Sequence, residues 1–183
     1  MLELDLSAFP VLRTQRLVLR EITLRDAPAF FRIRSNPRIM EHIGRPIATR
    51  MEDVEQLITN IMNDQRENTG ISWAITLLGD DTMIGTVGFY RLKKEHFRGE
   101  VGYALHSDHW RKGIMSEALE AVVDCGFQRL GFHSIEAITD PRNEASNALL
   151  RHCDFVREGL FKEDYFWNGE FLDSAVYSML APK

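Results

Sequence analysis

The residues best suited to chemistry in this sequence lie at positions 107–116, SDHWRKGIMS, between an apolar strand pattern and a long amphipathic helix pattern. The first turn of a helix presents backbone N–H groups without intrahelical acceptors, together with a positive dipole end. Gly113 lets the backbone approach a ligand, the hydroxyl of Ser116 can donate to a phosphate oxygen, and Arg111 and Lys112 add positive charge. The segment predicts a site for a diphosphate, or else Gly113 simply begins a surface helix.

The spacing of this segment excludes two common phosphate motifs. It lacks the G-x-x-x-x-G-K-[ST] pattern of a P-loop. It also lacks the G-x-G-x-x-G fingerprint of dinucleotide-binding folds, because Gly113 is its only glycine. The identity of the phosphate ligand therefore has to be inferred from another part of the sequence.

A second segment, residues 138–155, combines a turn with a helix start. Asn143 follows Pro141 and precedes a helix pattern, so it is a good N-cap whether or not it also contacts a ligand. Ser146 lies one turn further on, where it is either a functional hydroxyl or a small helix residue.

The elements that position these segments alternate between strand and helix patterns. Strands are predicted at residues 16–20, 71–77, 83–90, 97–106, 134–139, 155–161 and 171–180. Helices are predicted at residues 23–35, 49–66, 114–130 and 143–152, with Thr23 and Thr49 as N-caps. Residues 1–13 are expected to be a loose lead-in and residues 38–48 a loop. This order favours a mixed sheet with helices on both faces.

Composition limits the class of protein. With 183 residues, 44% hydrophobic and 27% charged, the chain fits a single domain over residues 1–183. The formal net charge of -5 argues against a nucleic-acid partner and weakly favours a cationic acceptor such as an amine, although a local basic patch stays possible. Two cysteines, no signal peptide and no membrane-length apolar run predict a cytoplasmic protein without a membrane partner.

Together the two segments resemble the GNAT (GCN5-related N-acetyltransferase) superfamily, in particular its ribosomal-protein N-terminal (alanine/serine) acetyltransferase branch. Residues 110–119 are similar to the W-G-K-G-Y-A-T-E-A-L pattern of that branch. The N-x-x-S-x-x-V-L-E-K-x-G-F pattern is matched by Asn143, Ser146, Leu149, Leu150 and Phe155. The resemblance extends to residues 14–20 and to Gly169, Asp173 and Tyr177 near the end.

The resemblance implies an α/β (α+β) fold with a mixed, mostly antiparallel sheet of roughly six to seven strands and about four helices on its two faces. Two parallel strands, ending near His106 and Thr139, would splay apart and admit the pantetheine arm of acetyl-CoA, the expected cosubstrate. No metal is implied. The residues expected to bind the cofactor are Ala104, Leu105, His106, Trp110, Arg111, Lys112, Gly113, Ile114, Met115, Ser116, Asn143 and Ser146.

The implied reaction is acetyl transfer to a primary amine in a ternary complex, with a protein or peptide N-terminal α-amine as first candidate. A small amine such as a polyamine, an amino sugar or an amino acid derivative is the alternative, and a non-catalytic acetyl-CoA-binding module is a further one. Glu100 is the candidate general base, or else a solvated glutamate paired with Arg98. The tyrosine that protonates the thiolate in many relatives falls on Leu150, so Ser146 or a water is expected to substitute.

The acceptor site is expected between residues 36–48, the helix at 49–66 and the aromatic-rich segment 162–170, unless those aromatic side chains belong to the core or to a homodimer contact. Two departures from the family pattern are noted. Met115 replaces a small residue and should make the pocket wall bulkier, and Asp154 replaces a glycine at a left-handed turn.

Overall fold

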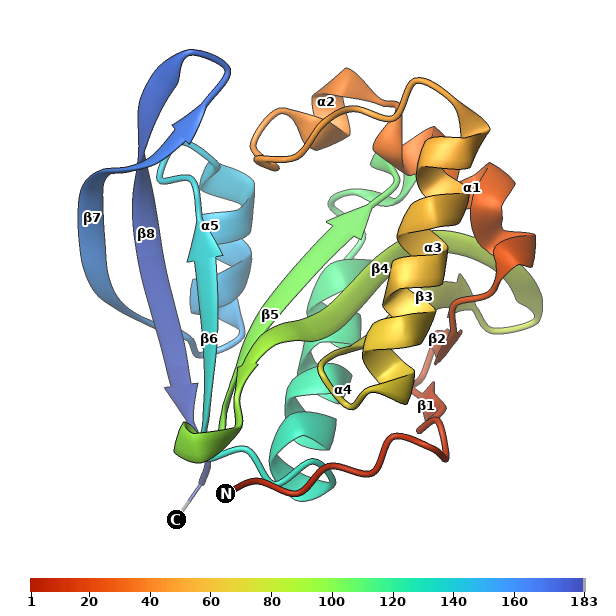
Figure 1. The fold of residues 1–183 in the computed structure, drawn as a ribbon, viewed down its shortest axis with the longest axis horizontal. Helices are drawn as coiled ribbons and strands as arrows, with labels where there is room; N and C mark the ends of the chain where they lie inside the picture. The colour runs from red at the N-terminus through yellow and green to blue at the C-terminus, as the bar shows by residue number, and fades with distance from the viewer. Residues whose placement is uncertain (183) are drawn as a thin grey trace.

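The computed structural model describes residues 1–182 as an eight-stranded mixed sheet flanked by helices (Figure 1). The strand order is β1-β2-β3-β4-β5-β6-β8-β7. The strands are β1 (Leu12–Arg13), β2 (Leu17–Glu21), β3 (Ile71–Leu77), β4 (Asp80–Lys93), β5 (Arg98–Leu105), β6 (Ser134–Thr139), β7 (Val156–Trp167) and β8 (Glu170–Leu180). The helices are α1 (Ala27–Arg34), α2 (Pro37–Met40), α3 (Met51–Arg66), α4 (Ile114–Gln128) and α5 (Glu144–His152).

The single parallel pairing in this sheet joins β5 to β6, and it is short. It spans only the pairs Arg98↔Ser134, Gly99↔Ile135 and Glu100↔Glu136. Beyond them the two strands diverge, while β5 stays paired with β4 as far as Leu105 and β6 stays paired with β8 as far as Thr139 (Figure 1). The predicted splay of two parallel strands is therefore present, and it opens toward the head of α4.

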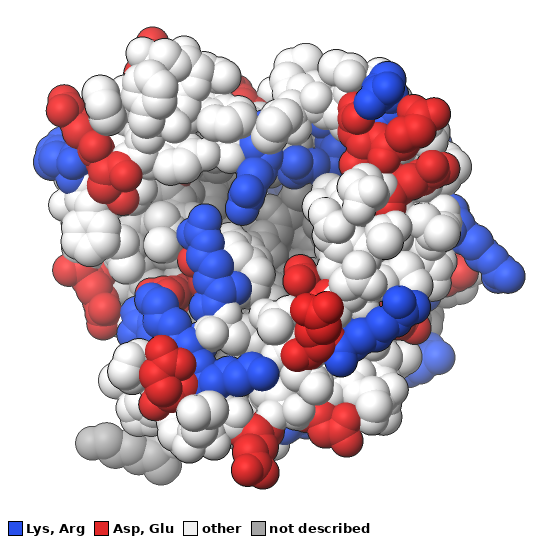
Figure 2. Space-filling model, viewed as in Figure 1, with Lys and Arg blue, Asp and Glu red and all other residues white. Residues whose placement is uncertain are grey.

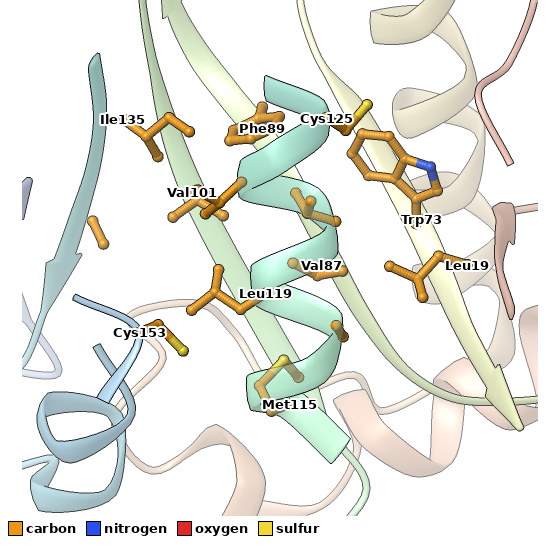
Figure 3. Close-up of a cluster of buried hydrophobic side chains, with 14 of the residues drawn as sticks. Leu19, Trp73, Val87, Phe89, Val101, Met115, Leu119, Cys125, Ile135 and Cys153 are labelled. Atoms are coloured by element: carbon orange, nitrogen blue, oxygen red, sulfur yellow. The ribbon is translucent and has the colours of Figure 1, made fainter. Parts of the chain in front are cut away.

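Two apolar clusters hold the helices to opposite faces of the sheet. On one face, Met115 and Leu119 of α4 pack against Val87 and Val101 of β4 and β5 (Figure 3). Full burial of one such side chain contributes about 1.5–3 kcal/mol. On the other face, Ile33 of α1 and further buried residues of α3 and β3 form a second cluster. The clusters make the sheet a rigid platform between the two helix layers.

The predicted mixed sheet is confirmed, with one strand more than expected because Leu12 and Arg13 pair with β2. Two local expectations were wrong. Residues 38–40, expected to be loop, belong to α2, in which Pro37 starts the helix and the Asn36 side chain accepts from the N–H of Arg38. The helix expected from Thr49 begins at Met51, because the Asp53 carboxylate accepts from the backbone N–H groups before it.

Candidate active site

The loop that precedes α4 has the backbone conformation of an anion-binding turn. Arg111 and Gly113 both lie in the left-handed region, with φ of 58° and 71°. Among residues 1–182, no protein group accepts a hydrogen bond from the backbone N–H groups of residues 111–116, and the first paired N–H of the helix is that of Glu117, which donates to Gly113. Successive N–H groups in such a turn form a concave nest for anions.

Polar side chains clamp this loop to the start of the sheet. The Glu117 carboxylate accepts from the Thr14 hydroxyl at 2.5 Å and from Nε of Arg16 at 2.6 Å. Arg16 in turn donates to the carbonyl of Lys112 at 2.8 Å, and the Lys112 ammonium donates to the carbonyl of Asp108 at 2.7 Å. Burial raises the pKa of Glu117, but the hydrogen bonds from Thr14 and Arg16 outweigh it and leave the pKa lowered. The predicted cation Lys112 thus braces the loop itself.

Trp110 joins the loop to the end of β5. Its indole N–H donates to the carbonyl of Leu105 at 2.8 Å, and the Arg38 guanidinium lies 5.1 Å from its ring centre. His106 accepts from the N–H of Asp108 at 3.4 Å, consistent with a local structural role. The chain between β5 and α4 is therefore held at both ends.

The main chain of β5 faces the splay at Leu105, one of the expected residues, and at Tyr103 rather than at Ala104. The N–H of His106 donates to Ile84 on β4 at 2.8 Å. Since main-chain groups point alternately to either side of a strand, those of Ala104 face β4, whereas those of Tyr103 and Leu105 face the gap. The expected backbone contact at Ala104 is therefore assigned to Tyr103, and the Leu105 N–H remains available.

On the other side of the splay, Ser146 is held in place from two directions. Its N–H donates to the side-chain oxygen of the N-cap Asn143 at 3.0 Å, and its hydroxyl lies 2.8 Å from that of Tyr103. Burial raises the pKa of Tyr103, which keeps its phenol protonated at neutral pH. Leu150 is fully buried. The hydroxyl pair therefore links β5 to α5 across the splay.

The loop places its apolar side chains away from the ligand. Ile114 and Met115 are buried in the core cluster, so they can offer a ligand only their backbone N–H groups. Figure 3 shows Met115 among the core side chains. The expectation that Met115 makes the pocket wall bulkier was therefore wrong. Asp154 does adopt the predicted left-handed conformation, with φ of 61°.

Glu100, the candidate base, is buried with 3% of its surface exposed. Arg91 donates to its carboxylate at 3.1 Å. The alternative of a solvated glutamate paired with Arg98 was wrong, because Arg98 pairs with Glu136 across the β5–β6 pairing at 2.9 Å. Burial and then the charge of Glu100 raise the pKa of Tyr90, its cross-strand neighbour.

A cavity of about 550 Å³ opens beside Glu100, between β4, β5, β6 and the β7–β8 hairpin, on the face that Figure 2 shows hollowed. A second buried carboxylate, Glu136, lines it and accepts from Lys93 at 2.9 Å and from Arg98 at 3.0 Å. Burial raises the pKa of Glu136, but these two cations outweigh it and hold the carboxylate ionised. Two bound cations therefore make Glu136 a poor proton acceptor.

The loop at 36–48 and the segment at 162–170, two of the three segments expected to form the acceptor site, are in contact, whereas no residue of α3, the third, lines the cavity between them. The Tyr165 hydroxyl donates to the carbonyl of Gly44 at 2.7 Å, and His42 lies 3.3 Å from the Asp140 carboxylate. A cavity of about 310 Å³ separates the two segments and is bordered by Trp167. The aromatic residues here are not core, since Phe161 and Phe166 are more than half exposed.

The two cysteines are not placed to act as nucleophiles. Cys125 and Cys153 are buried, and burial raises the pKa of both thiols, that of Cys153 to about 11. Within residues 1–182 no three His, Cys, Asp or Glu residues gather as metal ligands do. No helix in that part of the chain has the length and apolar character needed to cross a bilayer.

Sequence reasoning missed four residues of this region: Tyr103, Glu136, Glu117 and Arg91. Tyr103 lies in the strand predicted at 97–106, between Val101 and Leu105 on one face, a pattern that marks a core face rather than a functional hydroxyl. Glu136 could have been noticed, because it is an acidic residue between the apolar Ile135 and Ala137 of a predicted strand. In the sheet it lies directly opposite Glu100. No local signal identifies the partners of Glu117, which lie about 100 positions away in sequence.

Comparison with known proteins agrees with this geometry. A family model described as acetyltransferase (GNAT) domain matches residues 16–156. The uncharacterized N-acetyltransferase YoaA of Bacillus subtilis (strain 168) is 39% identical, over 96% of this chain and 99% of its own. The ribosomal-protein-serine acetyltransferase of Escherichia coli (strain K12) is 27% identical, over 70% of this chain and 71% of its own.

A solved structure shows the same fold. RimL, a ribosomal L7/L12 alpha-N-protein acetyltransferase in complex with coenzyme A, has a TM-score of 0.86 at 20% identity, over 94% of this chain and 98% of its own. At that identity the likeness concerns the fold alone. The family match and the identity to YoaA establish more: this chain is an acetyltransferase that belongs to the GNAT family.

Proposed function

We propose that this enzyme transfers the acetyl group of acetyl-CoA to a primary amine, with a protein or peptide N-terminal α-amine as the leading acceptor. The choice of acetyl-CoA as cosubstrate rests mainly on the backbone N–H groups of residues 111–116, which have no protein acceptor in the described part of the chain. A diphosphate satisfies such a nest at a helix head. The ribosomal-protein acetyltransferase among the relatives supports the acceptor class; a small amine is the alternative.

The residues around the splay fit the rest of that cofactor. The free main-chain groups of Tyr103 and the free N–H of Leu105 offer a strand-like edge to the amides of a pantetheine arm. Acetyl-CoA supplies an acetyl thioester at the end of that arm. The Leu105 N–H points into the gap, where it is suited to stabilise charge on a carbonyl oxygen.

Proton transfer is assigned to two groups on either side of the splay. An alkyl ammonium has a pKa near about 10, so the acceptor must lose a proton before attack. Glu100, directly or through a water, takes that proton. Ser146, whose hydroxyl is held by Tyr103, donates toward the leaving sulfur, which has a thiol pKa of about 8.5 and needs only modest help.

Glu100→Gln tests the base, with thiol release as the assay on a panel of peptides and small amines. The expected result is a loss of turnover of at least about 100-fold, the usual effect of removing a general base, with coenzyme A binding retained. Glu158→Gln is the matched control, because Glu158 lines the same cavity but is exposed. Full turnover in Glu100→Gln would remove Glu100 from the mechanism, and mass spectrometry of the product identifies the acetylated nitrogen.

A further inference from the structure

The hollow beside Glu100 is bordered by basic side chains, although the whole chain has a formal net charge of -5. Figure 2 shows lysine and arginine side chains reaching into it from the upper and left rims. Arg91, Lys93 and Arg98 line the larger cavity, and Arg45 lines the smaller one. Glu100, Glu136 and Glu158 line the same larger cavity, and Glu41 lines the smaller one, so the cations that matter are those without a carboxylate partner.

These cations fall into two groups. Arg91, Lys93 and Arg98 are ion-paired with the buried carboxylates of the same cavity. Arg34 and Arg45 differ, because no carboxylate of residues 1–182 lies within 4.0 Å of either guanidinium. Arg45, which lines the smaller cavity, and Arg34, at the end of α1, are therefore left to bind an anion from outside the chain.

The fold keeps these two arginines together. Arg34 is the last residue of α1, and its carbonyl accepts from the N–H of Ala48 at 3.0 Å, which returns the loop carrying Arg45 to the end of that helix. Burial and the nearby charge of Arg45 lower the pKa of Arg34, as expected for like charges held close. A bound anion relieves that repulsion.

Arg45 also lies near a neighbour of the candidate base. Glu100 raises and Arg45 lowers the pKa of Tyr90, so both charges act on one phenol. A Cβ on Gly102 would lie 2.5 Å from the Tyr90 ring, which places that ring against the strand next to the splay. Tyr90 therefore lies close to the candidate base on one side and to the loop that carries Arg45 on the other.

We propose that Arg34 and Arg45 bind a carboxylate of the acceptor, so that the enzyme selects amines that carry a negative charge close to the reacting nitrogen. This inference rests on the proposed function. The carboxylate comes from an acidic side chain near a peptide N-terminus or from the α-carboxylate of a small amino acid derivative. A polyamine would instead meet two like charges in this subsite.

The test uses the full-length enzyme, acetyl-CoA and three amidated peptides that start Ser-Asp, Ser-Asn and Ser-Lys and are otherwise identical. A comparison of alanine with alaninamide as acceptors tests whether a small amino acid derivative can supply the carboxylate. Spermidine tests whether a polyamine is acetylated. We expect kcat/KM for Ser-Asp to exceed that for Ser-Asn by about tenfold, the effect of one partly exposed charge-assisted hydrogen bond. The preference should decrease with added salt.

Arg45→Glu should reverse the order and favour Ser-Lys, whereas Arg32→Glu, the same change at an exposed position of α1, should leave it unaltered. Equal rates for the three peptides, a preference for spermidine, or an unchanged order in Arg45→Glu would overturn the subsite. If coenzyme A binds but no amine is acetylated, the proposed function fails. In that case calorimetric titration with the same peptides tests the arginine subsite separately. The proposal predicts that the Ser-Asp peptide binds more tightly to the wild-type enzyme than to Arg45→Glu.

Discussion

Replacing Gly113 by alanine probes the phosphate loop at the residue on which its conformation depends. Gly113 has φ of 71°, and a Cβ there would lie 3.3 Å from the Arg16 guanidinium. The left-handed conformation costs an alanine roughly 1–2 kcal/mol more than a glycine. For a chain of this size, each kcal/mol lowers Tm by about 2–4 °C. If the loop relaxes to avoid this strain, its N–H groups turn away from the diphosphate, and each 1.4 kcal/mol lost weakens binding about tenfold.

The assay combines thermal unfolding with calorimetric titration of coenzyme A. Gly169→Ala is the matched control, because Gly169 has φ of 86° in the β7–β8 turn and nothing lies within 4 Å of the added Cβ. Both variants should lose similar stability, and only Gly113→Ala should lose affinity for coenzyme A. Equal affinity in the two variants, each with lowered Tm, would refute the assignment of this loop to the cofactor.

Three further perturbations test the surroundings. Tyr103→Phe removes the partner of the Ser146 hydroxyl and should lower kcat several-fold at unchanged coenzyme A affinity; steady-state kinetics would contradict this if only KM moved. Glu117→Gln breaks the ion pair with Arg16, which is worth about 1 kcal/mol at this exposure, so coenzyme A should bind a few-fold more weakly by calorimetry unless the loop holds its shape unaided. The pKa of Glu136 is lowered on folding, so its stabilisation is present above the unfolded pKa and is lost as pH falls through the folded pKa. Urea unfolding at neutral pH and near pH 4 should therefore show a smaller decrease in the free energy of unfolding for Glu136→Gln than for wild type. Equal decreases would count against this reasoning.

Periodic patterns predicted the sheet and the four long helices because burial imposes a strand or helix period on the sequence. The segment 134–139 was predicted with its observed bounds, since Gly131 before it and Pro141 after it interrupt any regular element. The short β1 escaped prediction because two residues carry no period, and they form a strand only through pairing with β2.

The candidate site was predictable where chemistry is local. The turn at Gly113 and the N-cap at Asn143 depend on neighbouring residues, so their spacing in the sequence was informative. The partners of Glu100 and Ser146 were not predictable in the same way. Both come from separate strands, and which face a strand residue occupies depends on register that only the assembled sheet determines.

The central claim is that the backbone N–H groups of residues 111–116 bind the diphosphate of coenzyme A. Titration of ¹⁵N-labelled protein with coenzyme A, followed by amide NMR, tests it most directly. The account predicts that the amide resonances of residues 111–116 shift most, and that pantetheine without the diphosphate leaves them nearly unmoved. Saturable binding that shifts other amides and spares these would contradict it.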